Sequence, residues 1–138
     1  MSEPREVAVE RHGPVALIEF SRPPHNYFTV GLIEELADMV DALGADVSVR
    51  AIMLAAAGKT FCAGQEFTTS QIDVDEEQQP ELYVQGIRLY RSPKPIVVAV
   101  QGGAIGGGLG IPIVGDFRIA RLFSSLLALA ATLWAFWL

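Results

Sequence analysis

The sequence predicts an α/β fold in which strands and helices alternate. Runs rich in β-branched residues, such as 15–20 and 96–100, are typical of strands. Apolar residues spaced three and four apart across 30–43 are typical of one face of a helix. The order strand, glycine loop, helix, strand occurs at 50–91 and again at 96–120. We therefore expect repeating ββα units around one sheet.

The first elements are predicted to form a hairpin and a loop. Residues 7–10 and 15–20 indicate two strands, because Gly13 and Pro14 between them are typical turn residues. Residues 21–26 contain two consecutive prolines, which remove amide donors and fix φ. We expect that segment to be a loop.

The next segment is predicted to be a helix followed by a strand. The helix spans 30–43, with Thr29 as its N-cap and Gly44 as its end. Residues 50–56 form a short apolar run before Gly58. We interpret this run as a buried strand, although its periodicity alone leaves a helix open.

The second half is predicted to begin with a polar loop. Residues 64–80 are polar and most acidic at 73–77, which favours a solvated loop over an acidic recognition element. A helix is expected at 81–90, and strands at 96–100 and 117–120.

Composition limits the function classes. The 138 residues suit one domain, and a net charge of −6 argues against binding a nucleic acid. The single cysteine, Cys62, excludes an internal disulfide and a cysteine-based metal site, and no metal is expected. The first residues lack an apolar signal region, so cytoplasmic residence is the expectation.

Residues 101–110 form a glycine-rich loop after a predicted buried strand. The loop does not match a dinucleotide-binding fingerprint, because Ile111 stands where the third glycine is needed. The Gly-Lys-Thr at 58–60 does not complete a P-loop, because Met53 stands where the first glycine is needed. Amides at a helix N-terminus can hold an anion or a developing oxyanion. The alternative is that the glycines only permit close packing. Residues 61–65 follow the 50–56 strand in the same way, so two such loops could hold one carbonyl oxygen.

Three blocks of sequence have the order and spacing of a known family. They are SRPPHN at 21–26, VRAI at 49–52 leading to KTFCAG at 59–64, and PKPIVVAVQG at 93–102 leading to IGGGLG at 105–110, with DFRIA at 116–120 behind. These blocks resemble the crotonase superfamily of enoyl-CoA hydratases and isomerases. The resemblance covers about residues 7–120, which corresponds to the first half of a typical member, and it implies a crotonase-like spiral of ββα units that stops after the second glycine loop.

The resemblance implies that the chain binds an acyl-CoA thioester. The thioester oxygen would lie between the backbone amides of Gln65 and Gly107, which would stabilise the enolate. Ala63 and Gly64 would lie against the adenine of coenzyme A, and Gly106 would also contact the ligand. Coenzyme A would enter as part of the substrate, with no further cofactor, in fatty acid metabolism.

The acid–base half of that site departs from the family pattern. Hydratases carry a glutamate where this chain has Gly110, and a second one would fall near Ala130, where no ionisable residue follows Arg121. Hydration needs groups that orient water and deliver a proton. We therefore expect little or no hydratase activity, and whether the chain is an enzyme stays open.

The other reactive side chains are expected to have structural roles. Glu66 and Asp116 should hold loops or strand ends, and Cys62 should be a packed small residue. His12 and His25 are not assigned to catalysis. Pro112 is expected to bend or shorten the helix after the glycine loop.

Residues 121–138 are apolar and do not resemble the family, so the chain is divided into 1–120 and 121–138. Three interpretations stay open: a frameshifted or truncated product, a short membrane anchor, and a helix that covers the sheet. The resemblance implies a homo-oligomer, a trimer or hexamer, whose assembling segment is missing here. The alternative function is a non-catalytic acyl-CoA binder or oligomer-interaction fragment, with membrane association through the tail.

Overall fold

The computed structural model describes residues 6–66 and 75–120, and it contains one five-stranded sheet in the order β1-β2-β3-β4-β5. The first two strands are antiparallel and the later neighbours are parallel. The predicted α/β class is confirmed. The strands are β1 (Val7–His12), β2 (Val15–Phe20), β3 (Ala51–Ala56), β4 (Ile96–Val100) and β5 (Phe117–Ala120).

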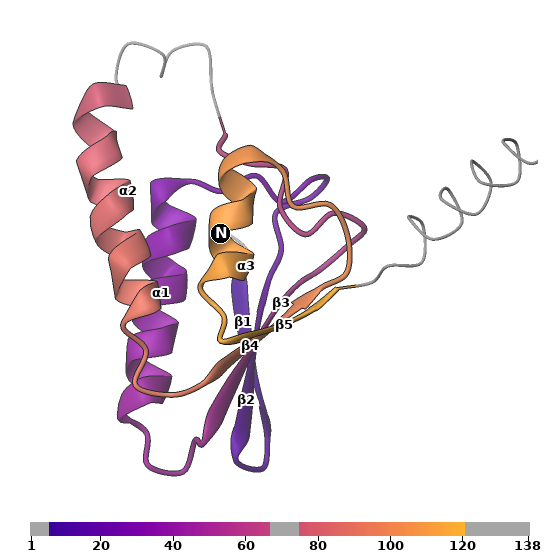
Figure 1. Cartoon of the computed structure of the whole chain (residues 1–138), viewed down its shortest axis with the longest axis vertical. Coiled ribbons are helices and arrows are strands. Elements are labelled where there is room, and N and C mark those ends of the chain that lie inside the picture. The colour runs from indigo at the N-terminus through magenta and orange to yellow at the C-terminus, as the bar shows by residue number, and fades with distance from the viewer. Residues whose placement is uncertain (1–5, 67–74, 121–138) are drawn as a thin grey trace, which may run out of the picture.

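The helices lie on one face of the sheet (Figure 1). They are α1 (Val30–Ala45), α2 (Asp75–Tyr90) and a short 3-10 segment η1 (Gly106–Leu109) that runs into α3 (Gly110–Ile113). Each helix connects two adjacent parallel strands in the same direction across the sheet. Because such crossovers are right-handed, they all place their helices on the same side.

The described part of the chain ends at Ala120. The segment 121–138, its three interpretations and the domain boundary after residue 120 lie outside the described residues. Within 6–66 and 75–120, no helix has the length and apolarity that crossing a membrane requires.

The β1–β2 hairpin follows from its turn residues. His12 pairs with Val15, so Gly13 and Pro14 form the two-residue connection. Gly13 has a φ of 60°, a value that glycine adopts without steric cost and that short hairpin loops need. The predicted hairpin is confirmed, and β1 runs two residues further than expected.

The start of α1 was predicted correctly but its end was not. The Oγ of Thr29 accepts a hydrogen bond from the amide of Leu32 at 3.2 Å, as an N-cap does. Gly44 lies inside the helix, which ends at Ala45 with Asp46 as its C-cap. A Cβ on Gly44 would lie 3.0 Å from two ring carbons of Pro93, so this glycine permits close packing rather than ending the helix.

The polar loop predicted for 64–80 is wrong from residue 75 onward, because α2 begins at Asp75 instead of residue 81. Proline is unfavourable inside a helix, yet Pro80 lies within this one. Packing on α1 overrides this local signal. Arg88 of α2 reaches two carboxylates of α1, Asp38 at 2.7 Å and Asp41 at 2.6 Å. Residues 67–74 of the predicted loop are not described.

The core lies between the sheet and the helices. Phe20 and Phe61 are fully buried and meet edge to face, with ring centroids 5.4 Å apart. Ile18, Leu54 and Val98 are also buried, one each from β2, β3 and β4. Burying one such side chain contributes about 1.5–3 kcal/mol, so the three central strands anchor the loops that follow them.

Asp116 fixes the register at the start of β5. Its Oδ2 accepts a hydrogen bond from the amide of Ile96 at 2.8 Å, and its own amide donates to the carbonyl of Ile96 at 2.9 Å. The expected structural role of Asp116 is confirmed.

The turn after α1 holds an acidic group with a lowered pKa. The hydroxyl and amide of Ser48 donate to Oδ1 of Asp46 at 2.6 and 2.8 Å, and Arg11 donates to Oδ2 at 2.9 Å. The hydrogen bonds from Ser48, followed by the one from Arg11, lower the pKa of Asp46 from 3.8 to about 2. Since the folded-state pKa is depressed, Asp46 stabilises the fold above pH 3.8, and this contribution is lost as the pH falls toward 2.

We predict that Ser48→Ala raises the pKa of Asp46, because the strongest hydrogen bond to its carboxylate is removed. Carbon-detected NMR titration of the Asp46 carboxyl group would measure the change. Ser21→Ala, an exposed serine in a different loop, is the matched control and should leave the titration unchanged. An unaltered pKa in Ser48→Ala would contradict this assignment.

Candidate functional site

The loops that follow β3 and β4 lie side by side, as the sequence predicted. Cys62 and Ala104 form a parallel bridge, and the amide of Ile105 donates to the carbonyl of Cys62 at 2.9 Å. The amides of Phe61 and Cys62 both donate to the carbonyl of Gly103, at 3.0 and 3.1 Å. These backbone bonds hold the two loops together at the carboxyl ends of their strands.

Two glycines are required by this contact. A Cβ on Gly102 would lie 1.9 Å from the carbonyl oxygen of Lys59, and one on Gly108 would lie 2.5 Å from the carbonyl oxygen of Cys62. The close-packing interpretation therefore holds for both positions. Cys62 is fully buried, and burial raises the pKa of its thiol, so its expected role as a packed residue is confirmed.

Phe28 positions Gln65. The two residues form a parallel bridge, in which the amide of Phe28 donates to the carbonyl of Gly64 and the amide of Glu66 donates to the carbonyl of Phe28, both at 2.9 Å. In a strand-like segment successive amides point to opposite edges. The amide of Gln65 is therefore directed away from Phe28.

The ring of Phe28 also supports Gly107. A Cβ on Gly107 would lie 3.1 and 3.2 Å from two carbons of that ring. Gly107 lies in the first turn of η1, directly after Gly106, whose φ of 54° turns the chain into the helical segment. Phe28 thus lies against both predicted oxyanion residues, through its backbone at Gln65 and through its ring at Gly107.

Gln65 and Gly107 line one pocket of about 380 Å³. The pocket lies among α1, α2 and α3, beyond the carboxyl ends of β3 and β4. In open α/β sheets ligands bind at this end of the strands. Its other lining residues are mostly apolar: Phe28, Ile33, Leu82, Tyr83, Gly86, Ile87, Leu89, Tyr90, Gly110, Ile111 and Val114.

The structure brings together some of the predicted site residues. Gln65 and Gly107 line this pocket together with Gly110, the position at which hydratases of the family carry a glutamate. Ala63 and Gly64 directly precede Gln65, and Gly106 directly precedes Gly107, but none of the three is among the lining residues of this pocket. Gly64 has a φ of 107° and is buried, and the amide of Ala63 donates to the carbonyl of His25 at 3.1 Å.

Charged side chains are absent among the described residues that line this pocket. Its polar side chains there are Gln65, Tyr83 and Tyr90. Gly110 contributes no carboxylate and has open space where a Cβ would lie. Within the described ranges, no three His, Cys, Asp or Glu side chains gather as metal ligands.

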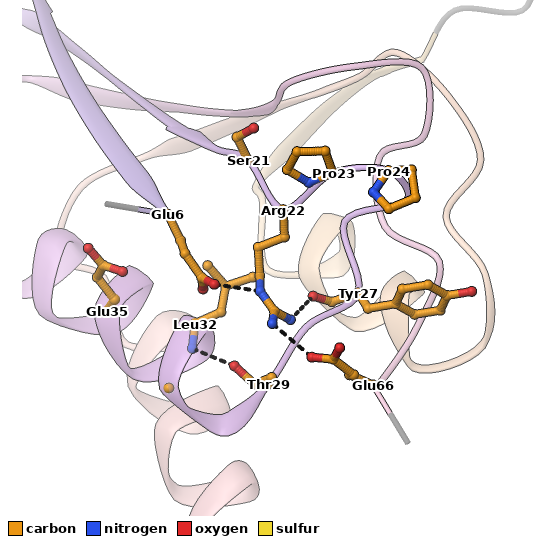
Figure 2. Close-up of a pocket in the computed structure, with 11 residues that line it drawn as sticks. Glu6, Ser21, Arg22, Pro23, Pro24, Tyr27, Thr29, Leu32, Glu35 and Glu66 are labelled. Carbon is orange, nitrogen blue, oxygen red and sulfur yellow. Dashed lines mark hydrogen bonds and ion pairs between the residues drawn. The ribbon is translucent and has the colours of Figure 1, made fainter. Parts of the chain in front are cut away.

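A second pocket, of about 1010 Å³, surrounds Arg22 in the loop after β2 (Figure 2). The guanidinium donates to Glu6 at 2.6 Å, to Glu66 at 2.7 Å and to the carbonyl of Tyr27 at 2.6 Å. Burial lowers the pKa of Arg22, but the hydrogen bonds to Glu66 and Glu6 outweigh this and raise it. The ion pair fixes Glu66, the residue after Gln65, which confirms the structural role expected for Glu66.

Asn26 connects the same loop to the segment after β3. Its side-chain amide donates to the carbonyls of Ala57 and Thr60 at 2.7 and 2.8 Å, and its Oδ1 accepts from the amide of Arg22 at 2.7 Å. It is buried and has a φ of 54°, which asparagine tolerates better than most residues. The segment 21–28 thus holds the loop after β3, which contains Gln65, in place.

Phe28 and the helical wall of the pocket were not among the predicted site residues. Phe28 follows a proline-containing loop, and nothing in its local pattern distinguishes it from an ordinary core residue. The wall from α2 had a detectable signal, because Leu82, Gly86 and Leu89 recur at helical spacing.

The family model and the curated relatives that match this chain agree on one family. The family model described as enoyl-CoA hydratase/isomerase matches residues 10–133. A probable enoyl-CoA hydratase of Bacillus subtilis is 34% identical over 110 residues, which are 77% of this chain and 43% of that protein. The 4-chlorobenzoyl coenzyme A dehalogenase-2 of an Arthrobacter species is 33% identical over 121 residues, which are 82% of this chain and 44% of that protein.

A solved structure gives the same result. The putative enoyl-CoA hydratase/isomerase (crotonase) of Legionella pneumophila superposes with a TM-score of 0.74 at 33% identity, covering 83% of this chain and 47% of that one. The chain therefore spans less than half the length of these relatives. With the family model matching most of its residues, the chain belongs to the enoyl-CoA hydratase/isomerase family of the crotonase superfamily.

Proposed function

We propose that the chain binds an acyl-CoA thioester and holds its carbonyl oxygen between the backbone amides of Gln65 and Gly107. The observation that carries this proposal is that both residues line one apolar pocket and both lie against the same residue: the backbone of Phe28 pairs with the segment of Gln65, and its ring lies beside Gly107. Preorganised amides directed at a developing oxyanion stabilise it without reorganisation. The enolate of a thioester bound in this way would have a lower free energy than the same enolate in water.

Coenzyme A enters as part of the ligand, and no separate cofactor is required for this role. Ala63, Gly64 and Gly106 extend from the two proposed amide donors along the same loops, so they would contact the coenzyme A portion outside the acyl pocket. Gly106 is exposed and has open space where a Cβ would lie, so its backbone can approach a ligand closely.

We expect the chain to bind acyl-CoA but not to catalyse hydration. Water addition needs a group that orients water and a group that delivers a proton. The described lining of the pocket has no carboxylate or imidazole for either task, and Gly110 offers none. We expect the 138-residue chain to bind acyl-CoA without measurable hydration of a short enoyl-CoA.

Calorimetric titration of the full chain with hexanoyl-CoA tests the proposal. We expect saturable binding, with free coenzyme A and hexanoate as controls that bind more weakly because each supplies only part of the contacts. Absence of saturable binding to every acyl-CoA would contradict the proposal. Turnover of crotonyl-CoA would contradict the expectation that hydration is absent.

The same lack of charge in the pocket favours a second candidate function, that of a non-catalytic acyl-CoA binder. Exchange of the α-protons of bound hexanoyl-CoA with deuterated water separates the two. Exchange above the solution rate indicates enolate formation, whereas binding without exchange indicates a carrier or sensor of the thioester.

A further inference from the structure

The helical wall of the pocket has a gap at Gly86. On α2 the residues Leu82, Gly86 and Leu89 occupy one stripe, and Tyr83, Ile87 and Tyr90 occupy the neighbouring stripe. All six line the pocket. Gly86 lies at the centre of this wall, and a Cβ built there would meet no atom within 4 Å.

A second gap lies on another wall. Gly110, the first residue of α3, lines the same pocket, and a Cβ there would also meet no atom within 4 Å. For Gly86, which lies in the interior of α2, glycine costs about 1 kcal/mol relative to alanine. Neither position needs glycine for backbone reasons, because neither has a positive φ. The missing side chains therefore leave space in the pocket.

The lining beside these gaps is apolar and uncharged. Ile33 and Ile111 are buried at 4% and 3% exposure, and Phe28 at 5%. A charged group placed among them would lose its hydration without gaining an ion pair from the described residues of the lining. An uncharged apolar group would gain free energy from the same burial.

We infer that Gly86 is the position that sets the size of the acyl group, and that the acyl groups accepted are uncharged, apolar and larger than acetyl. This inference rests on the proposed acyl-CoA binding. The thioester carbonyl would lie near Gln65 and Gly107, and the acyl group would extend along α2 into the space beside Gly86.

The test compares hexanoyl-CoA, acetyl-CoA and glutaryl-CoA by calorimetry, using the full chain. Hexanoyl-CoA should bind at least about tenfold more tightly than acetyl-CoA, because several buried methylene groups each add affinity. Glutaryl-CoA, with a terminal carboxylate, should bind no better than acetyl-CoA.

Gly86→Leu should lower the affinity for hexanoyl-CoA to about that for acetyl-CoA, because the leucine side chain fills the space that the longer acyl group would occupy. Gly86→Ala should reduce the preference partly, and it serves as the test if the leucine variant does not fold. Val84→Leu changes an exposed residue of α2 outside the pocket lining, and it should leave both affinities unaltered.

The outcomes distinguish failure of acyl-CoA binding from failure of the role inferred for Gly86. If wild type binds none of the three thioesters, the proposed function is wrong and the inference falls with it. If acetyl-CoA binds but hexanoyl-CoA has no advantage, or glutaryl-CoA equals hexanoyl-CoA, only the inference is overturned. A Gly86→Leu or Gly86→Ala variant that keeps the full preference overturns the role of Gly86.

Discussion

Gly102→Ala is expected to destabilise the protein by about 4 kcal/mol or more, among the largest effects of a single substitution. The added Cβ would lie 1.9 Å from the carbonyl oxygen of Lys59 and 3.2 Å from the Cα of Thr60. Both atoms belong to the backbone, so no side-chain rotation can relieve the overlap. The loops after β3 and β4 would have to separate, and their shared hydrogen bonds at Gly103 would be lost.

Urea unfolding followed by circular dichroism measures this effect. Gly86→Ala is the matched control, because its new Cβ meets open space within a helix. That variant should be more stable than wild type by about 0.5–1 kcal/mol. Equal stability of the two alanine variants would show that the loops do not pack as described.

Gly107→Pro is expected to weaken binding of hexanoyl-CoA by about tenfold, the equivalent of one lost hydrogen bond. Proline has no amide hydrogen, so one of the two proposed donors to the thioester oxygen disappears. Calorimetric titration measures the loss, and circular dichroism checks that the variant is folded.

Gly107→Ala is the control for this change, since it keeps the amide. Its Cβ would press on the ring of Phe28 at 3.1 Å, so a smaller loss of affinity is expected from the shift of that ring. If the proline and alanine variants lose affinity equally, the amide of Gly107 has no part in binding, and the loss reflects the loop alone.

Local signals in the sequence were sufficient for much of the fold. The turn at Gly13, the N-cap at Thr29 and the apolar strand at 96–100 each depend on interactions within a few residues. The side-by-side placement of the two glycine loops followed from their equivalent positions after neighbouring strands. The turn, the N-cap and the strand were predicted because no distant contact alters them.

Long-range packing decided what the sequence analysis could not predict. Gly44 has the local pattern of a helix end, yet it accommodates the ring of Pro93, a residue far along the chain. The polar character of 75–80 predicted a loop, yet α2 includes these residues. Phe28 supports both Gln65 and Gly107, and only the folded chain brings these segments together.

The central claim, that two amides hold a thioester oxygen, is tested most directly by the infrared carbonyl band of bound hexanoyl-CoA. A ¹³C label at the thioester carbonyl separates this band from the protein amides. Two hydrogen bonds from the preorganised donors Gln65 and Gly107 should move the bound band to lower frequency than in water, and Gly107→Pro should reverse part of that shift. A bound band at the frequency of the free thioester would contradict the claim.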